Sequence, residues 1–263
     1  MARTIAITGS ASGIGAATRR RLEEAGHRVI GVDRVDAEVV ADLATPVGRD
    51  EALRGIAERC DGALDGLVTC AGLAGLSDRP GSLLVAVNYF GTVALVAGAR
   101  QLLAAGHESA VVALSSNSTT TQPGVPVALV DACLAGDEAA ACTIGDAAGS
   151  IAAYPATKVA VARWIRRRST EPAWAGAGIR LNAVAPGLTE TAMTGEVRQD
   201  PVIGRFLDAF PVPIGRAGQP DDIAAAIAFL LGPDAAFAVG SVLFVDGGTD
   251  ALVRPDDWPA PQQ

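Results

Sequence analysis

The sequence predicts a single-domain α/β protein with a doubly wound parallel sheet and helices on both faces. Short apolar runs alternate with longer amphipathic segments along nearly the whole chain, which is the pattern of strands joined by crossover helices. The strand-like runs are apolar at most positions rather than at every second one, as strands covered on both faces are. With 263 residues, 49% of them hydrophobic, and no internal repeat or linker, the chain can bury a large core.

The first half of the chain predicts three strands, a short extended piece and two helices. A buried run at Thr4–Thr8 precedes a helix over residues 13–25, and Gly26 ends this helix because glycine suits the backbone of a helix C-terminus. The other elements follow the same alternation: a strand at Arg28–Asp33, an extended piece at 39–43, a helix at 49–60 and a strand at 64–70.

The second half continues the alternation and contains one long insertion. We predict mostly helix over residues 83–105, a strand at 110–115, a helix at 154–170, a strand at 179–184, a helix at Pro220–Leu231 and a strand at 241–245. Within the insertion, residues 117–153, the stretches 125–134 and 137–148 each predict a short helix, with Asp137 as an N-cap. The predicted domain spans residues 1–254, and the Pro-rich tail at 255–263 is either disordered or packed on a partner subunit.

Residues 190–215 have the composition of a lid. They mix apolar side chains such as Met193, Ile203 and Phe206 with glycine and proline. Such a segment can move and can cover a substrate with its apolar face, which excludes water. An ordinary surface helix is the alternative interpretation.

Composition argues against several classes of function. A net charge of −8 argues against nucleic-acid binding, and we interpret the cluster Arg166, Arg167 and Arg168 as a solvated helix face. The four cysteines have no C-x-x-C spacing and no histidine nearby, which predicts free thiols and no metal site. A strand pattern begins directly after Met1, and no apolar run approaches about 18 residues, so we expect no leader, no membrane span and a cytoplasmic location.

A glycine-rich loop follows the first predicted strand. Residues 8–15 read TGSASGIG, and a predicted helix begins within this run. Glycines let the backbone turn tightly and approach a pyrophosphate, while the helix N-terminus offers unpaired N–H groups and a partial positive charge. We therefore predict a Rossmann-type dinucleotide site, although a purely structural loop is the alternative. The residues expected to hold the cofactor are Gly9, Ser12, Gly13, Ile14 and Gly15.

An acidic residue, Asp33, ends the second predicted strand. A carboxylate at this place accepts hydrogen bonds from the adenosine ribose hydroxyls and repels a 2′-phosphate, which predicts NAD rather than NADP. Arg34 follows directly and would weaken this preference, and a plain strand-end role for Asp33 is the alternative. Because the carboxyl ends of parallel strands face the ligand crevice, we also predict that the cofactor site includes Asp42, Leu43, Cys70, Ala71 and Gly72.

Tyr154 and Lys158 stand four residues apart in a predicted helix, so that the phenol and the ammonium share one face. Pro155 fits if the helix begins near Tyr154, since proline is tolerated in a first turn. A nearby cation favours tyrosinate, and Lys158 is therefore predicted to lower the pKa of Tyr154. A phenol tuned in this way can exchange a proton with a carbonyl oxygen.

Together with the glycine loop, this pair makes the chain resemble the short-chain dehydrogenase/reductase family. The resemblance runs in order from Thr8 to Gly248, over nearly the whole chain. Its other landmarks are Asp33, Asp42-Leu43, Cys70-Ala71-Gly72, residues 87–91 (VNYFG), Ser115-Ser116, residues 180–182 (RLN), Pro186-Gly187 with Thr191, and residues 245–248 (VDGG). The resemblance implies an enzyme that passes hydride between NAD and an alcohol or carbonyl compound.

The resemblance also implies a role for each matching position. Ser116 would hold the substrate oxygen, and Tyr154 would be the acid in reduction and the base in oxidation. Lys158 would also bind the nicotinamide ribose, and Asn88 would hold a water in a proton relay behind it. Two alternatives stay open, namely Asn88 as a structural bridge between helix and strand, and Ser115 in place of Ser116. The nicotinamide carboxamide would be seated by Pro186, Gly187 and Thr191, with backbone groups of Leu188 and Thr189.

One position departs from the family pattern, since Cys70 stands where asparagine is common, and this removes a side-chain hydrogen bond but no catalytic group. The long insertion before Tyr154, with residues 65–68 (DGLV) and Arg254-Pro255, resembles the bacterial 3α-hydroxysteroid dehydrogenase/carbonyl reductases. That subgroup implies a hydroxysteroid or another bulky apolar carbonyl as substrate. In the family, the helices that match residues 83–105 and 154–170 often pack against another subunit. Because the insertion would block that contact and redirect assembly, we expect a homodimer rather than a tetramer.

Three rival functions stay open from the sequence. The first is a dehydrogenase for a different small alcohol. The second is a nucleotide-sugar epimerase or dehydratase, which the glycine spacing and the lack of a large C-terminal sugar domain disfavour. The third is a non-catalytic NAD-sensing protein, which has no need for Ser116, Tyr154 and Lys158 together.

Overall fold

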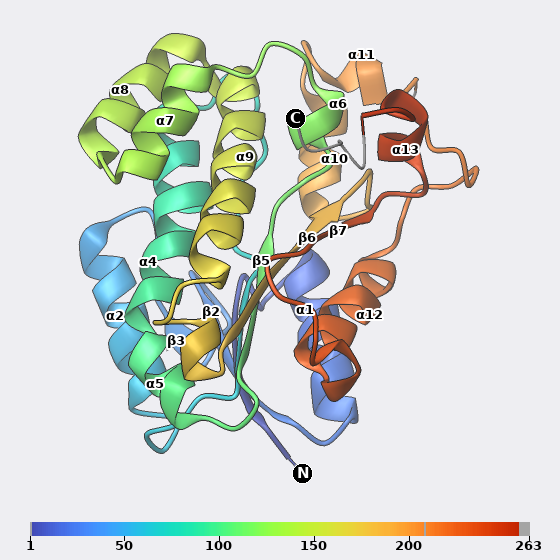
Figure 1. The fold of residues 1–263 in the computed structure, drawn as a ribbon. Coiled ribbons are helices and arrows are strands. Elements are labelled where there is room, and N and C mark those ends of the chain that lie inside the picture. Colours follow the sequence, from blue (N-terminus) through green and yellow to red (C-terminus); the bar gives the residue numbers. More distant parts are fainter. Residues whose placement is uncertain (1, 208, 258–263) are drawn as a thin grey trace.

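A computed structural model of the protein describes residues 2–207 and 209–257. Seven parallel strands form one sheet in the order β3-β2-β1-β4-β5-β6-β7 (Figure 1). The order runs outward in both directions from β1 and β4, which confirms the predicted doubly wound sheet and places a ligand crevice at the carboxyl ends of these two strands. The strands are β1 Thr4–Thr8, β2 Arg28–Asp33, β3 Val39–Val40, β4 Gly66–Thr69, β5 Ala110–Leu114, β6 Arg180–Pro186 and β7 Val242–Val245.

Helices cover both faces of the sheet. On one face lie α1 (Gly13–Glu24) and α12 (Pro220–Leu231), and on the other lie α2 (Pro46–Ala57), α4 (Gly91–Gly98) and α9 (Ser150–Ser169) (Figure 1). Strand β5 accounts for this arrangement, since Val112 and Leu114 join the core under α1 and α12, whereas Val111 and Ala113 join the core under α9. Successive side chains of a strand point to opposite faces, so a continuously apolar strand is buried on both.

Several predicted boundaries in the first half differ from the structure, including the end of α2 at Ala57 rather than residue 60 and the span of β4, Gly66–Thr69 rather than 64–70. The extended piece predicted over 39–43 pairs with β2 only at Val39–Val40. Helix α2 begins at Pro46 rather than near residue 49, because Thr45 Oγ1 accepts a hydrogen bond from the N–H of Gly48 at 3.0 Å and caps the helix. Proline suits the first turn that follows such a cap.

The stretch predicted as helix over 83–105 is interrupted. It consists of α3 (Gly81–Leu84), a π-helical turn η1 (Val85–Phe90), α4 and α5 (Arg100–Ala105). By length and composition alone Gly81–Gly98 could span a bilayer, contrary to the expectation that no apolar stretch is long enough. However, 61% of it is buried inside the protein, which is the behaviour of a core helix. The π-helical turn contains Asn88, and such turns often lie at functional sites.

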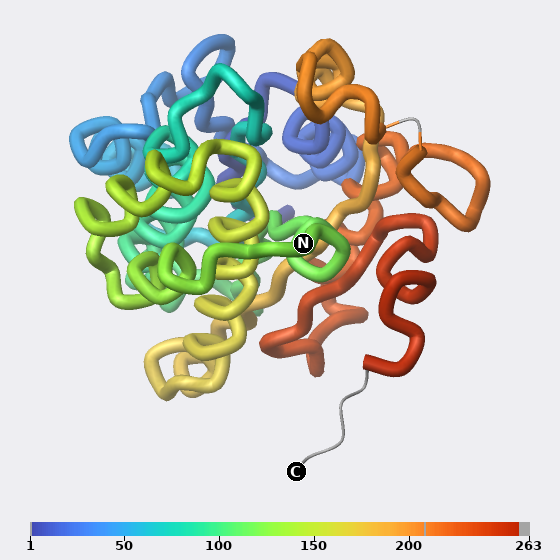
Figure 2. Tube along the Cα trace, turned by 90° about the horizontal axis from the view of Figure 1, so that it is seen from above, coloured from blue at the N-terminus to red at the C-terminus, as the bar shows by residue number. Residues whose placement is uncertain are grey.

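The insertion before α9 is helical, as predicted. It contains α6 (Ser118–Thr121), α7 (Val127–Ala135) and α8 (Glu138–Ala148), which gather beside α9 (Figure 2). Asp137 caps α8 as predicted, since its carboxylate accepts from the N–H of Ala140 at 3.0 Å. The buried guanidinium of Arg49 anchors α8 by donating to both carboxylate oxygens of Glu138, at 2.7 and 2.6 Å.

The helix that carries Tyr154 begins earlier than predicted. Helix α9 starts at Ser150, so Pro155 lies inside it rather than at its start. Proline has no N–H, and the carbonyl oxygen of Ile151 therefore lacks its helical donor. Gln122 supplies a donor instead, because its side-chain amide bonds that oxygen at 3.1 Å. A side chain of the insertion thus satisfies the backbone group that the proline leaves open.

The remaining helices gather near the carboxyl ends of the strands or connect them. They are α10 (Ala192–Gln199), α11 (Gly204–Leu207), α13 (Thr249–Val253) and two 3₁₀ turns, η2 (Ala175–Ala177) and η3 (Pro233–Ala235). The segment predicted as a lid over 190–215 therefore contains α10 and α11. Of the predicted tail at 255–263, residues 258–263 lie outside the described residues.

Candidate active site

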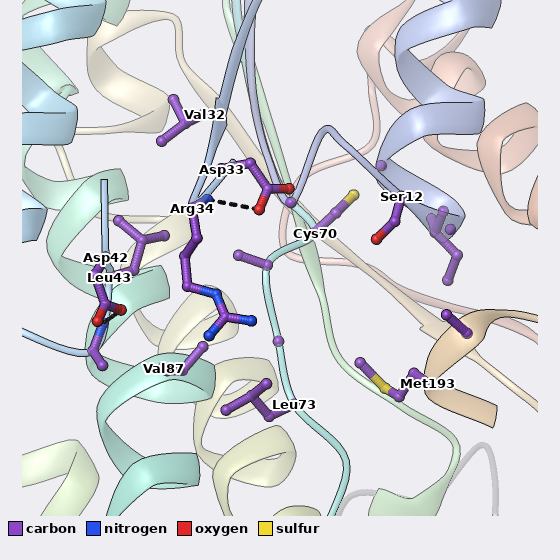
Figure 3. Close-up of a pocket in the computed structure, with 18 of the residues that line it drawn as sticks. Ser12, Val32, Asp33, Arg34, Asp42, Leu43, Cys70, Leu73, Val87 and Met193 are labelled. Atoms are coloured by element: carbon purple, nitrogen blue, oxygen red, sulfur yellow. Dashed lines mark hydrogen bonds between the residues drawn. The ribbon is translucent and has the colours of Figure 1, made fainter. Parts of the chain in front are cut away.

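A crevice lies where the glycine loop, the end of β2 and the loop after β4 meet (Figure 3). Apolar neighbours of the predicted residues complete its lining, among them Val32, Leu73, Val87 and Met193. The sequence signal for Val32 and Leu73 is only their place beside a motif, whereas Val87 belongs to the landmark at residues 87–91 and Met193 to the predicted lid. The predicted cofactor residues that the crevice brings together are Gly9, Ser12, Gly13, Ile14, Gly15, Asp33, Arg34, Asp42, Leu43, Cys70, Ala71 and Gly72.

Two glycines are required by the close approach of backbone segments. Gly9 has a φ of +68°, and a Cβ atom there would lie 2.7 Å from the amide nitrogen of Ala71. A Cβ atom on Gly15 would lie 2.0 Å from the carbonyl oxygen of Gly9. Any larger residue would push the loop away from β4 or from α1, so the narrow cradle at the start of α1 depends on both glycines.

The carboxylate of Asp33 is held at the end of β2 by two backbone donors. The N–H of Ala11 bonds Oδ2 at 3.0 Å, and the N–H of Arg34 bonds Oδ1 at 2.7 Å (Figure 3). These donors fix the orientation of the carboxylate at the edge of the crevice. On the neighbouring wall, Arg49 Nε donates to the carbonyl oxygen of Leu43 at 2.9 Å and holds that loop in place.

A second cavity of about 810 Å³ opens beside the crevice. Crevice and cavity share lining residues, including Cys70, Gly72 and Thr191, so they form one continuous site. The cavity brings together the predicted residues Ser116, Tyr154, Lys158, Pro186, Gly187, Leu188, Thr189 and Thr191. The rest of its wall is largely apolar and includes Ala74, Ile151, Met193, Val197, Val202, Ile203, Phe206, Leu207 and Phe210.

Lys158 is buried on α9, with its ammonium directed at β5. The residue is 5% exposed, and Nζ donates to the carbonyl oxygen of Leu114 at 3.0 Å. Nζ lies 6.0 Å from the centroid of the Tyr154 ring, so the two side chains share one face of α9 as predicted. Burial disfavours the charged form and lowers the pKa of Lys158 to about 8.

The pKa of Tyr154 is raised rather than lowered. Desolvation by the surrounding protein is the largest cause, and a hydrogen bond with Ser116 acts in the opposite direction. The predicted lowering of the pKa of Tyr154 is therefore wrong. Burial has the larger effect, and the same burial draws Lys158 itself toward its neutral form.

The two serines after β5 have different partners. Ser115 Oγ donates to the backbone carbonyl of Lys158 at 3.1 Å and thereby ties β5 to α9. Ser116 Oγ accepts from the N–H of Ser118 at 3.1 Å, and Ser116 is the side chain that acts to lower the pKa of Tyr154. Of the two alternatives that the sequence left open, this geometry favours Ser116 as the serine that acts beside the Tyr154 hydroxyl.

Asn88 is fully buried in the π-helical turn and holds the loop after β4. Its Oδ1 accepts from the N–H of Leu73 at 2.7 Å, and its Nδ2 donates to the carbonyl of Leu73 at 3.0 Å. These bonds are the structural bridge that the sequence left open as an alternative. Asn88 also adjoins Lys158, since a Cβ atom on Gly72 would lie 3.2 Å from Asn88 Oδ1 and 3.5 Å from Lys158 Nζ. Its part in a proton relay stays a prediction.

Thr191 connects the two parts of the site. It caps α10, because its Oγ1 accepts from the N–H of Thr194 at 3.2 Å, and it lines both the crevice and the cavity. A Cβ atom on Gly13 would lie 3.4 Å from Thr191 Cγ2, so the glycine loop and the segment after β6 come together here. Residues from both halves of the sheet therefore surround one space.

Two protein-family descriptions match the chain. Residues 3–128 match the family described as short chain dehydrogenase, and residues 139–250 match the one described as enoyl-(acyl carrier protein) reductase. The first match contains the glycine loop, Asp33 and Ser116, and the second contains Tyr154, Lys158 and Thr191. The two matches therefore account for both parts of the site.

Individual relatives cover nearly the full length. The chain is 42% identical to the 3-alpha-hydroxysteroid dehydrogenase/carbonyl reductase of Comamonas testosteroni, over 97% of this chain and 99% of that protein. It is 33% identical to the galactitol 2-dehydrogenase (L-tagatose-forming) of Cereibacter sphaeroides, over 92% and 93%. The solved structure of the 3-alpha-hydroxysteroid dehydrogenase from Pseudomonas sp. B-0831, complexed with NADH, matches with a TM-score of 0.92 and 49% identity, over 96% and 99%. The chain therefore belongs to the short-chain dehydrogenase/reductase family.

Proposed function

We propose that the protein is an NAD-dependent oxidoreductase that interconverts a secondary alcohol and a ketone. The observation that carries the proposal is the continuity of the two spaces, since Gly72 and Thr191 line both of them. A dinucleotide bound in the crevice can extend into the cavity, where Ser116, Tyr154 and Lys158 gather. The same residues are those expected to perform the reaction.

The crevice fits NAD by its shape and its charge. Its glycine loop is packed so closely against neighbouring backbone that it leaves no room for a Cβ atom at Gly9 or Gly15, and Asp33 presents a fixed carboxylate to a ribose. Bound NADH supplies the hydride for reduction of the ketone. Pro186, Gly187, Leu188, Thr189 and Thr191 line the cavity beside Tyr154 and are the residues we assign to the carboxamide end.

Ser116 and Tyr154 are the residues that we assign to proton transfer. In reduction, Ser116 holds the carbonyl oxygen of the substrate while the Tyr154 hydroxyl donates its proton to the same oxygen. The raised pKa of Tyr154 keeps the phenol protonated at neutral pH, which is the state that reduction requires. In oxidation the tyrosinate accepts the proton of the alcohol. Lys158 holds a cofactor ribose hydroxyl and, while charged, favours the tyrosinate.

The substrate class follows from the size and lining of the cavity. A space of about 810 Å³ with a largely apolar wall suits a hydroxysteroid or another bulky apolar carbonyl better than a sugar. The name of the relative from Comamonas testosteroni supports the same class. The direct test is a panel of steroid, aromatic and small polar ketones with NADH and with NADPH, followed at 340 nm. Turnover confined to small polar substrates would overturn this assignment.

Asp33→Asn is expected to raise the ratio of kcat/KM for NADPH to that for NADH by about tenfold or more. The substitution removes the negative charge that opposes a 2′-phosphate and weakens the acceptor for the ribose hydroxyls. Steady-state kinetics with both cofactors and one ketone measure the ratio. Asp36→Asn is the matched control, because it removes a carboxylate from the exposed loop beyond β2 and asparagine tolerates the positive φ there. Equal ratios in the two variants would speak against the role of Asp33.

We further infer that the protein is cytoplasmic and forms a homodimer. Its free cysteines, which are reduced in the cytoplasm, support the location. Exposed apolar side chains on α12, on the segment between η3 and β7, and on β7 support the dimer. Strand β7 is an edge strand, and an edge strand offers unpaired backbone groups that can pair with another chain. The exposed apolar side chains are Phe229, Phe237, Val239 and Leu243.

Sedimentation at micromolar concentration is expected to give a dimer, and Phe237→Glu is expected to give a monomer. The substitution places a charge at the most exposed of these apolar side chains, where a partner would have to desolvate it. Val127→Glu, on the exposed surface of α7 in the insertion, is the matched control and should leave the dimer intact. A monomeric wild type, or a dimer that only Val127→Glu disrupts, would refute the assignment.

A further inference from the structure

Asp200 lies between α10 and α11 and has an unusual number of hydrogen-bond donors. The residue is 8% exposed. Its Oδ2 accepts from the backbone N–H of Ser77 at 2.6 Å and from Ser77 Oγ at 2.8 Å. Its Oδ1 accepts from the N–H groups of Val202 at 2.8 Å and Ile203 at 3.0 Å. One carboxylate therefore joins the turn between α10 and α11 to a loop that lies far away in the sequence.

The residues on both sides of this carboxylate line the substrate cavity. Val202 and Ile203, whose amides bond Oδ1, belong to the apolar wall on the side of α11. Ala74 and Gly75, which lie just before Ser77, belong to the part of the wall formed by the loop after β4. The bonds of Asp200 thus join two parts of the cavity wall that are far apart in the sequence.

A second contact joins the same two segments. Arg79 donates to the backbone carbonyl of Ala74 at 2.7 Å and to the carboxylate of Glu196, on α10, at 3.2 Å. The loop after β4 is itself anchored to α9, because the N–H of Leu76 donates to Ser150 Oγ at 3.1 Å. Ser150 begins the helix that carries Tyr154. The connection therefore reaches from α10 to the helix of the predicted catalytic residues.

We propose that Asp200 is a positioning residue that holds residues 192–207 against the loop after β4 and so sets the shape of the substrate cavity. Ser77 is its principal partner, and Arg79 with Glu196 forms a weaker, more exposed second link. The expected effect on substrate binding rests on the proposed function, whereas the expected loosening of residues 192–207 from the loop after β4 does not. The same donors lower the pKa of Asp200 to about 2, so the carboxylate stays charged across the neutral range.

The proposal is tested first without any substrate, by amide hydrogen exchange of the full chain. In Asp200→Asn, a side-chain NH₂ group, itself a donor, replaces an oxygen that accepts from Ser77 or from the N–H groups of Val202 and Ile203. Ser77→Ala removes only the hydroxyl donor and keeps the backbone N–H. We expect exchange at Val202 and Ile203 to become faster in both variants, by about tenfold in Asp200→Asn and by less in Ser77→Ala. Exchange within β4 and β5 should stay at the wild-type rate.

Kinetics form the second part of the test. With a bulky apolar ketone, Asp200→Asn is expected to raise KM by about tenfold, while the Kd for NADH stays within about twofold of the wild type. A small ketone that does not reach α11 should show a smaller change in KM. Loss of NADH binding together with substrate binding would indicate general damage and would overturn the positioning role.

The matched control is Asp78→Asn. Asp78 adjoins Ser77 in the chain, but within residues 2–207 and 209–257 it has no hydrogen bond or ion pair that the substitution would break. This variant should behave like the wild type in both measurements. Unchanged exchange in Asp200→Asn and Ser77→Ala would refute the inference, even if the enzyme is fully active. A wild type that reduces no ketone would instead refute the proposed function and leave the exchange result valid.

Discussion

Tyr154→Phe is expected to lower kcat for ketone reduction by roughly 10²- to 10⁴-fold, while the Kd for NADH changes by less than about twofold. The substitution keeps the ring that packs beside Lys158 but removes the hydroxyl that lines the cavity with Ser116. Single-turnover rates with NADH and a ketone measure the chemical step, and quenching of NADH fluorescence measures binding.

The chain offers a matched control, because its only other tyrosine is Tyr89. Tyr89 is buried in the core beside Phe90, away from the cavity lining, so Tyr89→Phe should keep nearly full activity. This pair of variants also separates an enzyme from an NAD-sensing protein. A sensor would bind NADH equally well in the wild type and in Tyr154→Phe and would reduce no ketone in either form.

The fold could be predicted from the sequence because its signals are local. Each strand is an apolar run, and the helix start at α8 is marked by Asp137, whose side chain caps it as expected. The predicted start of α9 is wrong because a proline normally marks a first turn. That rule failed here because Gln122, from a segment well before the helix, bonds the carbonyl that Pro155 leaves open. No local pattern around Pro155 reveals this partner.

In the candidate site, too, the features that a short stretch of sequence contains could be predicted, and the contacts between distant segments could not. The glycine loop, Asp33 and the Tyr154–Lys158 pair are each contained in a few consecutive residues, and the structure brings them around one space. The apolar character of residues 190–215 was also visible, and several of these residues do line the cavity. The sequence does not show how this segment is held against the loop after β4, because Asp200 and Ser77 are far apart in the chain and meet only in the folded protein.

The pKa values of Tyr154 and Lys158 show a further limit of prediction from the sequence. Spacing alone places a cation beside a phenol and predicts a lowered pKa for that phenol. It does not report how deeply both groups are buried. In the structure burial dominates, raising the pKa of Tyr154 and lowering that of Lys158. A sequence can therefore identify the pair without giving the charge state in which it rests.

Lys158→Met is expected to lower kcat by about 10²-fold or more and, at neutral pH, to stabilise the fold by about 1–3 kcal/mol. Methionine has a similar length and no charge, so it removes the free-energy cost of burying an ammonium. This cost is what lowers the pKa of Lys158 to about 8. Loss of the hydrogen bond to Leu114 offsets part of this gain. Urea unfolding followed by circular dichroism measures stability, and steady-state kinetics measure kcat.

The lowered pKa of Lys158 also predicts how the difference in stability between the wild type and Lys158→Met changes with pH. Because the pKa of Lys158 is lower in the folded protein than in the unfolded chain, the unfolded chain binds more protons between about pH 8 and its ordinary value of 10.5. The wild type should therefore gain stability relative to Lys158→Met as the pH rises through this window. The difference between the two proteins should be largest below pH 8. A difference that is constant from pH 7 to pH 10 would contradict the lowered pKa.

The composition of the chain allows that pKa to be measured directly. Lys158 is its only lysine, so an amine-directed acylating reagent can label this side chain and the N-terminus alone. The rate of labelling at Lys158 should follow a pKa near 8, and NADH should slow it if the ammonium holds the cofactor ribose. Lys158→Arg keeps a charge that does not titrate in this range, and it should lack the pH-dependent change in stability. These measurements therefore compare, at one nitrogen atom, the cost of burying the amine with its effect on the reaction.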